Sequence, residues 1–459
     1  MFVLLAGLIC LAKGPDVALK IFFPSTLLQA AAAINLPALG SSVITPSYVL
    51  IGFFVLSLAT RAEMYPRMMR PLSFPEPGFY LLCTTIFCLW SAMFLPRLFA
   101  GEIIVFSIAR GDAGEGIALR LLAPSASNIT QAVYFLSNLV CFVLVARYIA
   151  VYRKWSNIAE AVLICGALNL FFAALDLISF RMGWPLLEIV RTANYRMLVD
   201  GEILGLKRIV GSFPEAGAFG YATMGIFAFS LKVWLGGHYQ RAAGWITCLS
   251  FLALLLCTSS TAYVTMVLFS LFVYMESLMV SSSGDGRNSY RNVLLYVPVI
   301  LMTIVLIIVM NSTLIDGLQQ FFERTLFNKL ETQSGKERSE WNMHAARIFI
   351  ETMGLGAGVG SVRASSIILA MLSNIGVLGT LLYGGFLLTL LRRDTGKGPS
   401  KKNIPLEAVV RDGARSSCLA MLIASAMSAG SIDLGLTFFF FAGVVCAPMT
   451  RPIPKSVPV

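Results

Sequence analysis

Residues 366–391 read SIILAMLSNIGVLGTLLYGGFLLTLL, a continuous apolar run without aspartate, glutamate, lysine or arginine. An α-helix needs about 20 predominantly apolar residues to cross the hydrocarbon core of a bilayer, so this run is long enough to span one. A transmembrane β-barrel would instead require short segments of alternating hydrophobicity, and the sequence contains none. The run therefore predicts a transmembrane helix.

Similar apolar runs recur along the whole chain. The composition agrees with them, because 57% of the residues are hydrophobic and only 13% are charged, whereas soluble domains carry about 25% charged residues. We therefore predict an all-α, polytopic integral membrane protein with about 12 or 13 transmembrane helices. The first run is short, so whether it forms a full span stays open. The expected spans are residues 1–12, 17–36, 46–60, 79–96, 129–150, 157–179, 216–235, 242–257, 261–280, 292–311, 366–391, 414–431 and 434–449.

Lysine and arginine gather in every second loop, and these loops are short and almost free of acidic residues. By the positive-inside rule they face the cytoplasm. This orientation explains much of the formal charge of +11, so we expect no nucleic-acid partner. The basic residues are Arg61, Arg67, Arg70, Arg147, Arg153, Lys154, Arg287, Arg291, Arg392, Arg393, Lys397, Lys401, Lys402, Arg411 and Arg415, followed by Arg451 and Lys455 in the tail.

The opposite side carries three longer loops, at about residues 97–128, 180–215 and 312–365, which mix charges with aromatic residues and glycines. Loops of this length are usually functional or disordered. Because these loops keep many apolar residues, we expect ordered structure at the membrane surface, with amphipathic helices in the largest loop. The chain is thus divided into helices over 1–311, the large external loop 312–365, and the C-terminal helices and tail over 366–459.

Metal and nucleotide sites are not indicated. All nine cysteines lie in or at the ends of apolar runs and lack metal-ligand spacing, so we interpret them as packing residues. The segment GLGAGVGS, residues 354–361, follows no predicted strand and matches neither dinucleotide nor P-loop spacing. We therefore expect no metal and no cofactor.

Residues 334–361, SGKERSEWNMHAARIFIETMGLGAGVGS, are dense in charge within an apolar chain. Their spacing predicts a helix with one polar stripe and a less polar stripe beside it. Ser334 or Ser339 is the expected N-cap. Such a helix either lies on the bilayer, anchored by its tryptophan, or directs Arg338 into a cavity. The polar stripe contains Glu337, Glu340, His344, Arg347 and Glu351, and the second contains Trp341, Ala345, Ile348 and Thr352.

The four glycines that follow permit positive φ and close backbone approach, so they serve either as an anion nest or as a flexible re-entry loop. A second cluster on the same side is GLKRIVGSFPEAGAFGYATMG, residues 205–225. Proline suits the first position of a helix, so we expect a helix to begin at about residue 214. Lys207 and Arg208 beside that N-terminus indicate an anion site, and Glu215 either serves chemistry or complements the helix dipole.

These clusters, in this order, resemble the bacterial O-antigen polymerase and O-antigen ligase superfamily, and more closely its exopolysaccharide repeat-unit polymerases. The chain departs from the pattern at Thr261, where the family often has arginine, and at His344, which does not align with the histidine of the ligase branch. We therefore favour a polymerase. The matching residues are Arg208-x-x-Gly211-x-Phe213-x-Glu215, Ser334-Gly335-x-Glu337-Arg338-x-x-x-Trp341, Gly354-x-Gly356-x-Gly358-x-Gly360-Ser361, and SNIGVLGTLLYG at 373–384.

The resemblance implies a metal-independent membrane glycosyltransferase in the bacterial inner membrane. Such an enzyme transfers a glycan from undecaprenyl diphosphate to a second lipid-linked repeat unit at the periplasmic face. Its implied partners are the lipid-linked oligosaccharides, the bilayer, and a chain-length regulator and flippase. The alternatives are an O-antigen ligase and a transporter of lipid-linked oligosaccharides.

Arginine suits a departing diphosphate because its planar fork binds two phosphate oxygens and stays ionised. We expect Arg208 and Arg338 to stabilise that leaving group, and Glu215 to act as the catalytic base. Glu337, Glu340 and His344 are rivals for the base, or the diphosphate itself accepts the proton. The expected substrate-binding residues are Arg347, Arg363, Arg196, His344, Trp341, Gly356 and Gly358.

Overall fold

The structure is a computed structural model, and its helices dominate the fold. It describes residues 2–36, 42–60, 70–109, 116–195, 197–203, 205–282, 288–309, 319, 323, 332–395 and 404–448. Within these ranges there are fourteen α-helices and three two-stranded antiparallel sheets. The chain is an all-α polytopic membrane protein, as predicted.

Each apolar run of the sequence contains one helix. Six of the helices are long and apolar enough to cross a bilayer, namely α4, α5, α6, α7, α9 and α13. The helices are α1 (Phe2–Lys13), α2 (Pro15–Ser25), α3 (Pro46–Ala59), α4 (Pro77–Leu98), α5 (Ala126–Tyr152), α6 (Trp155–Met182), α7 (Ala216–Leu235), α8 (Gln240–Leu256), α9 (Ser260–Ser282), α10 (Asn288–Val309), α12 (Gln333–Glu351), α13 (Ile367–Leu391), α14 (Leu406–Ser428) and α15 (Gly435–Cys446).

Two expected boundaries were wrong. The second span was expected to reach residue 36, but α2 ends at Ser25 because the following backbone pairs with a distant loop, through Ala30 and Ser212. Arg411 and Arg415 were assigned to a basic loop, but both lie in α14. The α1 helix has 12 residues and is therefore about 18 Å long, which is too short to span a bilayer alone.

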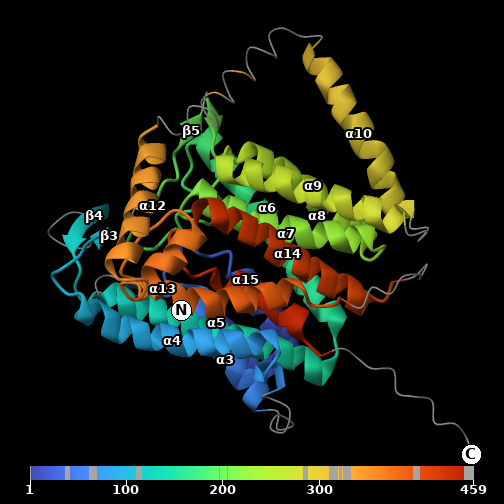
Figure 1. Cartoon of the computed structure of the whole chain (residues 1–459). Coiled ribbons are helices and arrows are strands. Elements are labelled where there is room, and N and C mark those ends of the chain that lie inside the picture. Colours follow the sequence, from blue (N-terminus) through green and yellow to red (C-terminus); the bar gives the residue numbers. More distant parts are fainter. Residues whose placement is uncertain are drawn as a thin grey trace, which may run out of the picture.

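The centre of the bundle is occupied by α15, in which every residue from Leu436 to Cys446 is buried. The α5 and α14 helices lie beside it, and Phe229 of α7 packs against its Phe441 (Figure 1). Peripheral helices instead expose apolar faces, as Ile86, Trp90 and Phe94 do at helical spacing on α4. This distribution suits a solvent of lipid, in which the outer face of a bundle stays apolar.

A buried ionic network lies between α7, α9 and α14. Lys232 pairs with Glu276, and its Nζ lies 3.7 Å from a carboxylate oxygen of Asp412. Asp412 also accepts a hydrogen bond of 3.1 Å from Arg415. The charges of α14 are therefore compensated inside the protein, which is why a helix with four charged residues packs against apolar neighbours.

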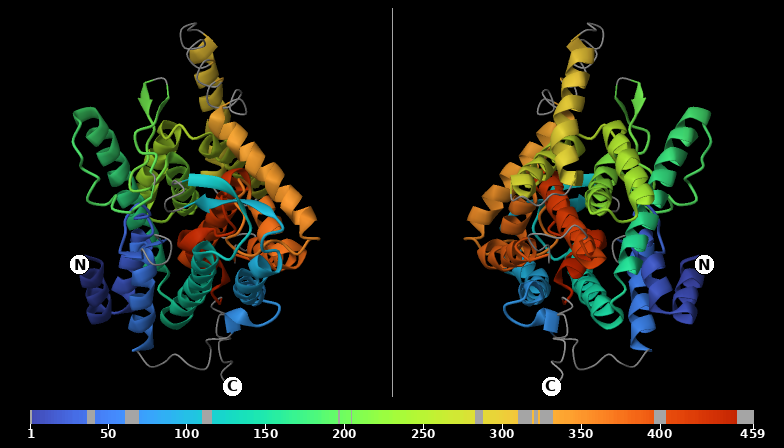
Figure 2. Two further views of the ribbon diagram at one scale, coloured as in Figure 1. Left: turned by 90° about the vertical axis from the view of Figure 1, so that its left-hand side faces the viewer. Right: turned by 90° about the vertical axis from the view of Figure 1, so that its right-hand side faces the viewer.

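Two β-hairpins and α12 lie at one end of the bundle, which we call the hairpin end (Figures 1 and 2). The longer hairpin joins β3 (Ile104–Ala109) to β4 (Gly116–Leu121), and the shorter joins β5 (Glu202–Ile203) to β6 (Leu206–Lys207). A third pair, β1 (Ile34–Leu36) and β2 (Ser42–Ile44), connects α2 to α3. The ordered structure expected in the long loops is thus present in their described parts.

Candidate functional site

The candidate site forms around the N-terminus of α7. The helix begins at Ala216 and not at Pro214 as expected, and Glu215 is its N-cap in an extended conformation. The Glu215 side chain makes no capping hydrogen bond. The backbone before the helix is held by other segments, because the carbonyl of Pro214 accepts a 2.9 Å hydrogen bond from the amide of Leu198. Glu215 therefore keeps a half-buried carboxylate at the helix terminus.

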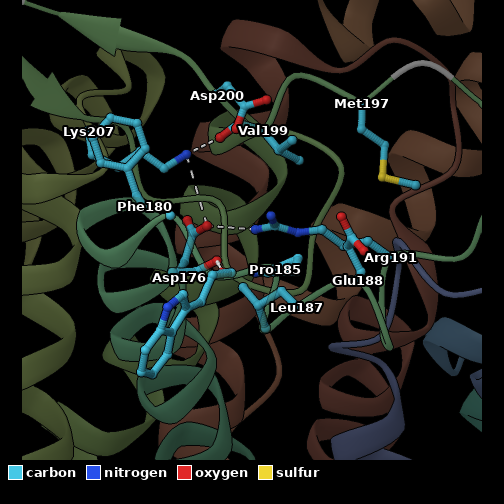
Figure 3. Close-up of a pocket in the computed structure, with 13 residues that line it drawn as sticks. Asp176, Phe180, Pro185, Leu187, Glu188, Arg191, Met197, Val199, Asp200 and Lys207 are labelled. Carbon is cyan, nitrogen blue, oxygen red and sulfur yellow. Dashed lines mark hydrogen bonds and ion pairs between the residues drawn. The ribbon is translucent and has the colours of Figure 1, made fainter.

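Asp176 fixes the turn that leads into α7, and its carboxylate lies between Arg191 and Lys207 (Figure 3). One carboxylate oxygen accepts hydrogen bonds from the amides of Val210 and Gly211, at 2.8 and 3.1 Å. The other pairs with Arg191 at 2.7 Å and lies 3.9 Å from Nζ of Lys207. Gly211 has a φ of 60°, a conformation that favours glycine. A single buried carboxylate therefore holds the backbone after Arg208 and lies close to the side chain of Lys207, the residue before it.

A pocket of about 450 Å³ opens beside Asp176. Its ionisable lining residues are three acids and two bases, so the pocket has no excess of positive charge for an anion. Burial lowers the pKa of the Lys207 amine, and the Asp176 carboxylate opposes that shift. Lys207, which the sequence placed at an anion site, instead serves this ionic cluster. The ionisable lining residues are Asp176, Glu188, Asp200, Arg191 and Lys207.

Arg208 directly follows β6, which ends at Lys207. Its amide donates a 3.0 Å hydrogen bond to the carbonyl of Gly201. Its Nε is buried and has no hydrogen-bond partner among the described residues. The guanidinium lies within electrostatic reach of Cys257 and Tyr263, at the connection between α8 and α9. Arg208 thus keeps unused hydrogen-bonding capacity near the start of α7.

Arg363 lies in the connection between α12 and α13. Its amide donates a 2.9 Å hydrogen bond to the carbonyl of Phe106 in β3. Its guanidinium carbon lies 5.3 Å from the centroid of the Trp341 ring of α12, a cation–π contact. A Cβ on Gly430 would come within 2.9 Å of the same carbon, so the glycine leaves room for the cation. The Nε of Arg363 is buried without a partner in the described part of the chain.

Three charged groups from different elements act on one another here. Burial lowers the pKa of the Arg363 guanidinium, Arg338 of α12 lowers it further, and the Glu215 carboxylate opposes both. Within the described residues, no ion pair joins Glu215 to any of the three arginines. We call Arg208, Arg338, Arg363 and Glu215 the arginine cluster. Arg338, Arg363 and Glu215 act on one another, and Arg208 lies in the segment that leads into α7, whose N-cap is Glu215.

The α12 helix presents the predicted stripes. Ala345, Ile348 and Thr352 are buried, whereas Arg347 and Glu351 are exposed. The expected N-cap was wrong, because the hydroxyl of Thr332, and not that of Ser334 or Ser339, accepts a 3.3 Å hydrogen bond from the amide of Gly335.

Two other expected ligands, His344 and Arg347, also lie on α12. The Nε2 of His344 lies 2.8 Å from the carbonyl oxygen of Ile104, and its ring packs edge-on against Phe106 at 5.1 Å. His344 therefore docks α12 on the β3–β4 hairpin. Arg347 is exposed on the opposite side of the helix from the buried Ala345 and Ile348. Arg196, the remaining expected ligand, lies outside the described residues.

Gly356 and Gly358 pack the glycine segment against α13 and α4. The amide of Gly356 donates to the hydroxyl of Thr352 at 3.0 Å, and the amide of Gly358 donates to the carbonyl of Asn374 at 2.9 Å. A Cβ would come within 2.7 Å of backbone at Gly356 and within 2.6 Å of Pro96 at Gly358. Because these amides are used inside the protein, the expected anion nest does not include them.

The arrangement therefore differs from the expected ranking of residues. The sequence placed Arg363 behind Arg208 and Arg338, but Arg363 is the member that contacts Trp341 and responds to both Glu215 and Arg338. Its position after four glycines was the only available signal. Comparison with models of known protein families finds no match, and comparison with curated proteins finds no significantly similar sequence.

Proposed function

We propose that this chain is a polysaccharide polymerase that uses undecaprenyl-diphosphate-linked donors. The observation that carries the proposal is the arginine cluster, in which the Arg338 and Arg363 guanidinium groups and the Glu215 carboxylate act on one another at the N-terminus of α7, with Arg208 in the segment that leads into that helix. A helix N-terminus adds about half a positive charge to that site. The combined field favours an anion with more than one negative charge, as the diphosphate leaving group has.

The reaction requires this field when the bond between the anomeric carbon and the diphosphate oxygen breaks. The donor glycan forms a new bond to a hydroxyl oxygen of the acceptor, and the hydroxyl proton leaves for a base. Negative charge then develops on the diphosphate, and cations held in position before the reaction stabilise it most effectively. Guanidinium groups with unused N–H donors, as in Arg208 and Arg363, suit phosphate oxygens.

The surroundings of the arginine cluster suit a lipid-linked substrate. Large apolar side chains are exposed on α12 and on the turn that follows it, where water would disfavour them. An amphipathic helix of this kind lies at a bilayer surface with its apolar residues in lipid. A polyprenyl chain would therefore stay in the membrane while its diphosphate reaches the cations. The exposed apolar residues are Met343, Ile350, Met353 and Leu355.

This proposal gives each member of the cluster a role. Arg363, held by Trp341, and Arg208 bind the diphosphate, and Arg338 completes the cationic site from α12. Glu215 binds a sugar hydroxyl or accepts its proton. The site faces the periplasm in the bacterial inner membrane, because the basic loops lie at the other ends of the helices.

The direct test is a reconstituted reaction. The purified chain in nanodiscs is mixed with lipid-linked repeat units extracted from host cells that lack the gene, without nucleotide and with EDTA. A ladder of products separated by one repeat unit supports the proposal. Absence of a ladder from folded protein, with substrate recovered intact, would reject it.

Two alternatives are separated by the same preparation. A ligase would transfer the glycan once to a lipid A core acceptor and give no ladder. A transporter is favoured by one observation, the buried network of Lys232, Glu276 and Asp412 between three helices. It would move a fluorescent lipid-linked oligosaccharide across proteoliposomes and leave its glycosidic bond to diphosphate intact.

A further inference from the structure

A polar stripe on α5 connects the glycine segment to an aspartate that the arginine cluster does not contain. Asn128, Gln131, Tyr134 and Asn138 recur at helical spacing and share one face of α5. At the first end, Asn128 donates to the carbonyl of Val359 at 2.7 Å. At the other end, Asn138 donates to the carboxylate of Asp433 at 2.7 Å. The stripe therefore lines the helix from the loop region into the protein interior.

Asp433 lies in the connection between α14 and α15 and is half-buried. Its Oδ1 accepts hydrogen bonds from Asn138 and, at 2.7 Å, from the amide of Gly435. No lysine, arginine or histidine of the described residues forms an ion pair with it. Burial raises the pKa of its carboxyl group, and the two hydrogen bonds oppose that shift. The position therefore holds an uncompensated carboxyl group.

Polar atoms beside Asp433 lack hydrogen-bond partners. The hydroxyl of Tyr383 and the Oδ1 of Asn138 belong to fully buried side chains, and neither has a partner within the described residues. Asp433 lies within electrostatic reach of Tyr383. Buried polar groups in native proteins are normally satisfied, so these two atoms leave hydrogen-bonding capacity beside Asp433. A sugar hydroxyl, which both donates and accepts hydrogen bonds, matches that capacity.

The aromatic residues around Asp433 support a sugar ligand. Tyr48 of α3 and Tyr134 of α5 stack with ring centroids 4.5 Å apart, and both are half-buried. Asp433 lies within electrostatic reach of Tyr48. Aromatic rings present an apolar face beside a polar hydroxyl, which suits the mixed surface of a pyranose.

The same connection also reaches the arginine cluster. Gly430, three residues before Asp433, lies against the guanidinium of Arg363. A donor diphosphate bound to Arg363 and an acceptor hydroxyl bound to Asp433 would therefore lie close together, because Gly430 and Asp433 belong to the same short connection.

We propose that Asp433 is the catalytic base that takes the proton of the acceptor hydroxyl, with Tyr383 and Asn138 hydrogen-bonded to that acceptor sugar. The inference rests on the proposed polymerase function and replaces Glu215 in the role of base. As the hydroxyl oxygen forms its bond to the anomeric carbon, its proton passes to the free oxygen of the carboxylate. The electron pair of the broken bond leaves with the diphosphate.

The test compares Asp433→Asn with the wild type in nanodiscs, using lipid-linked repeat units extracted from cells that lack the gene. Asparagine keeps an oxygen for Asn138 and Gly435 but cannot accept the proton. We expect the single-turnover transfer rate to fall by about 100-fold or more, as for loss of a general base. Binding of undecaprenyl diphosphate should stay within about twofold, because the arginine cluster is intact. Asp200→Asn is the matched control, a carboxylate outside the proposed chemistry, and should transfer at the wild-type rate.

A second pair of variants keeps the inference falsifiable if Asp433→Asn does not fold. Tyr383→Phe removes one hydroxyl from a packed ring and should raise KM for the acceptor about tenfold, with donor binding unchanged. Formate should restore part of the transfer rate to Asp433→Gly. Two results, each obtained with a wild type that does form a ladder, would overturn this inference and leave the proposed function standing. One is full activity of Asp433→Asn; the other is an unchanged acceptor KM and full activity of folded Tyr383→Phe. A wild type without a ladder would instead overturn the proposed function.

Discussion

The guanidinium of Arg363 lies over the indole ring of Trp341, with its central carbon 5.3 Å from the ring centroid. The two residues belong to different elements, the connection before α13 and the α12 helix. The contact ties the orientation of the Arg363 cation to the docking of an amphipathic surface helix. A change in the position of α12 would therefore change the charge presented to a substrate.

Replacing Trp341 with leucine should slow transfer because it removes the aromatic face that orients Arg363. A desolvated cation–π contact contributes about 2 kcal/mol, which corresponds to about 30-fold. The measurement is the single-turnover rate in nanodiscs. Trp341→Phe retains a weaker aromatic face, so its single-turnover rate should lie between those of the wild type and of the leucine variant. Equal rates for leucine and tryptophan would show that the contact does not support catalysis.

Gly430→Ala should displace the Arg363 guanidinium. Its Cβ would come within 2.9 Å of the guanidinium carbon, closer than van der Waals contact allows. We expect weaker binding of undecaprenyl diphosphate, by about tenfold, measured by thermophoresis of labelled nanodiscs. Gly384→Ala is the matched control, because a Cβ at Gly384 meets no atom within 4 Å. The prediction is wrong if both variants bind equally well.

Asp176→Leu should destabilise the folded protein strongly. The substitution leaves Arg191 and Lys207 without their shared carboxylate and removes the acceptor of two backbone amides. Breaking a buried pair in this way costs about 3–5 kcal/mol. Thermal unfolding in detergent should show a lower Tm than the wild type. A Tm for Asp176→Leu equal to that of the exposed-site variant Lys336→Ala would contradict the assigned role.

The transfer rate should fall as the pH falls through the pKa of Asp433. Burial raises this pKa, so the carboxylate required of a base is lost at a higher pH than for an ordinary aspartate. The acid limb of the single-turnover rate should therefore disappear in Asp433→Asn. If the rate of that variant fell with pH in the same way as the wild type, the titrating group would be another residue and not Asp433. The other polar or titratable groups that face Asp433 are Tyr48 on α3, Asn138 on α5, Tyr221 on α7 and Tyr383 on α13.

The helices were largely predictable from the sequence, because an apolar run of transmembrane length has one common solution in lipid, in which every backbone group bonds within the helix. The stripes of α12 were also predictable, because residues three and four apart share one face of a helix. The end of α2 was not predictable, because it depends on pairing between Ala30 and Ser212 far along the chain. Arg411 looked like a loop residue because part of what compensates its charge, including the Trp155 ring, comes from other helices.

The candidate site was predictable only in part. Local motifs identified both segments that carry the cluster, since charge at a helix N-terminus and glycine-rich turns are visible in sequence. The position of Arg363 was not predictable, because it depends on contacts with α12, the β3–β4 hairpin and Gly430, which are far apart in the sequence. Likewise, no local pattern links Asn138 to Asp433, which are joined by a hydrogen bond across 295 positions.

The central claim is that Arg208 and Arg338 act on the same departing diphosphate. Its most direct measurement is the single-turnover transfer of a lipid-linked repeat unit by Arg208→Ala and Arg338→Ala, with Lys336→Ala as an exposed control on α12. We predict that each arginine variant inserts and folds normally but loses at least about 100-fold in rate, as for removal of one preorganised charge-stabilising donor, while the control transfers normally. Transfer at the wild-type rate by either folded arginine variant would contradict the claim.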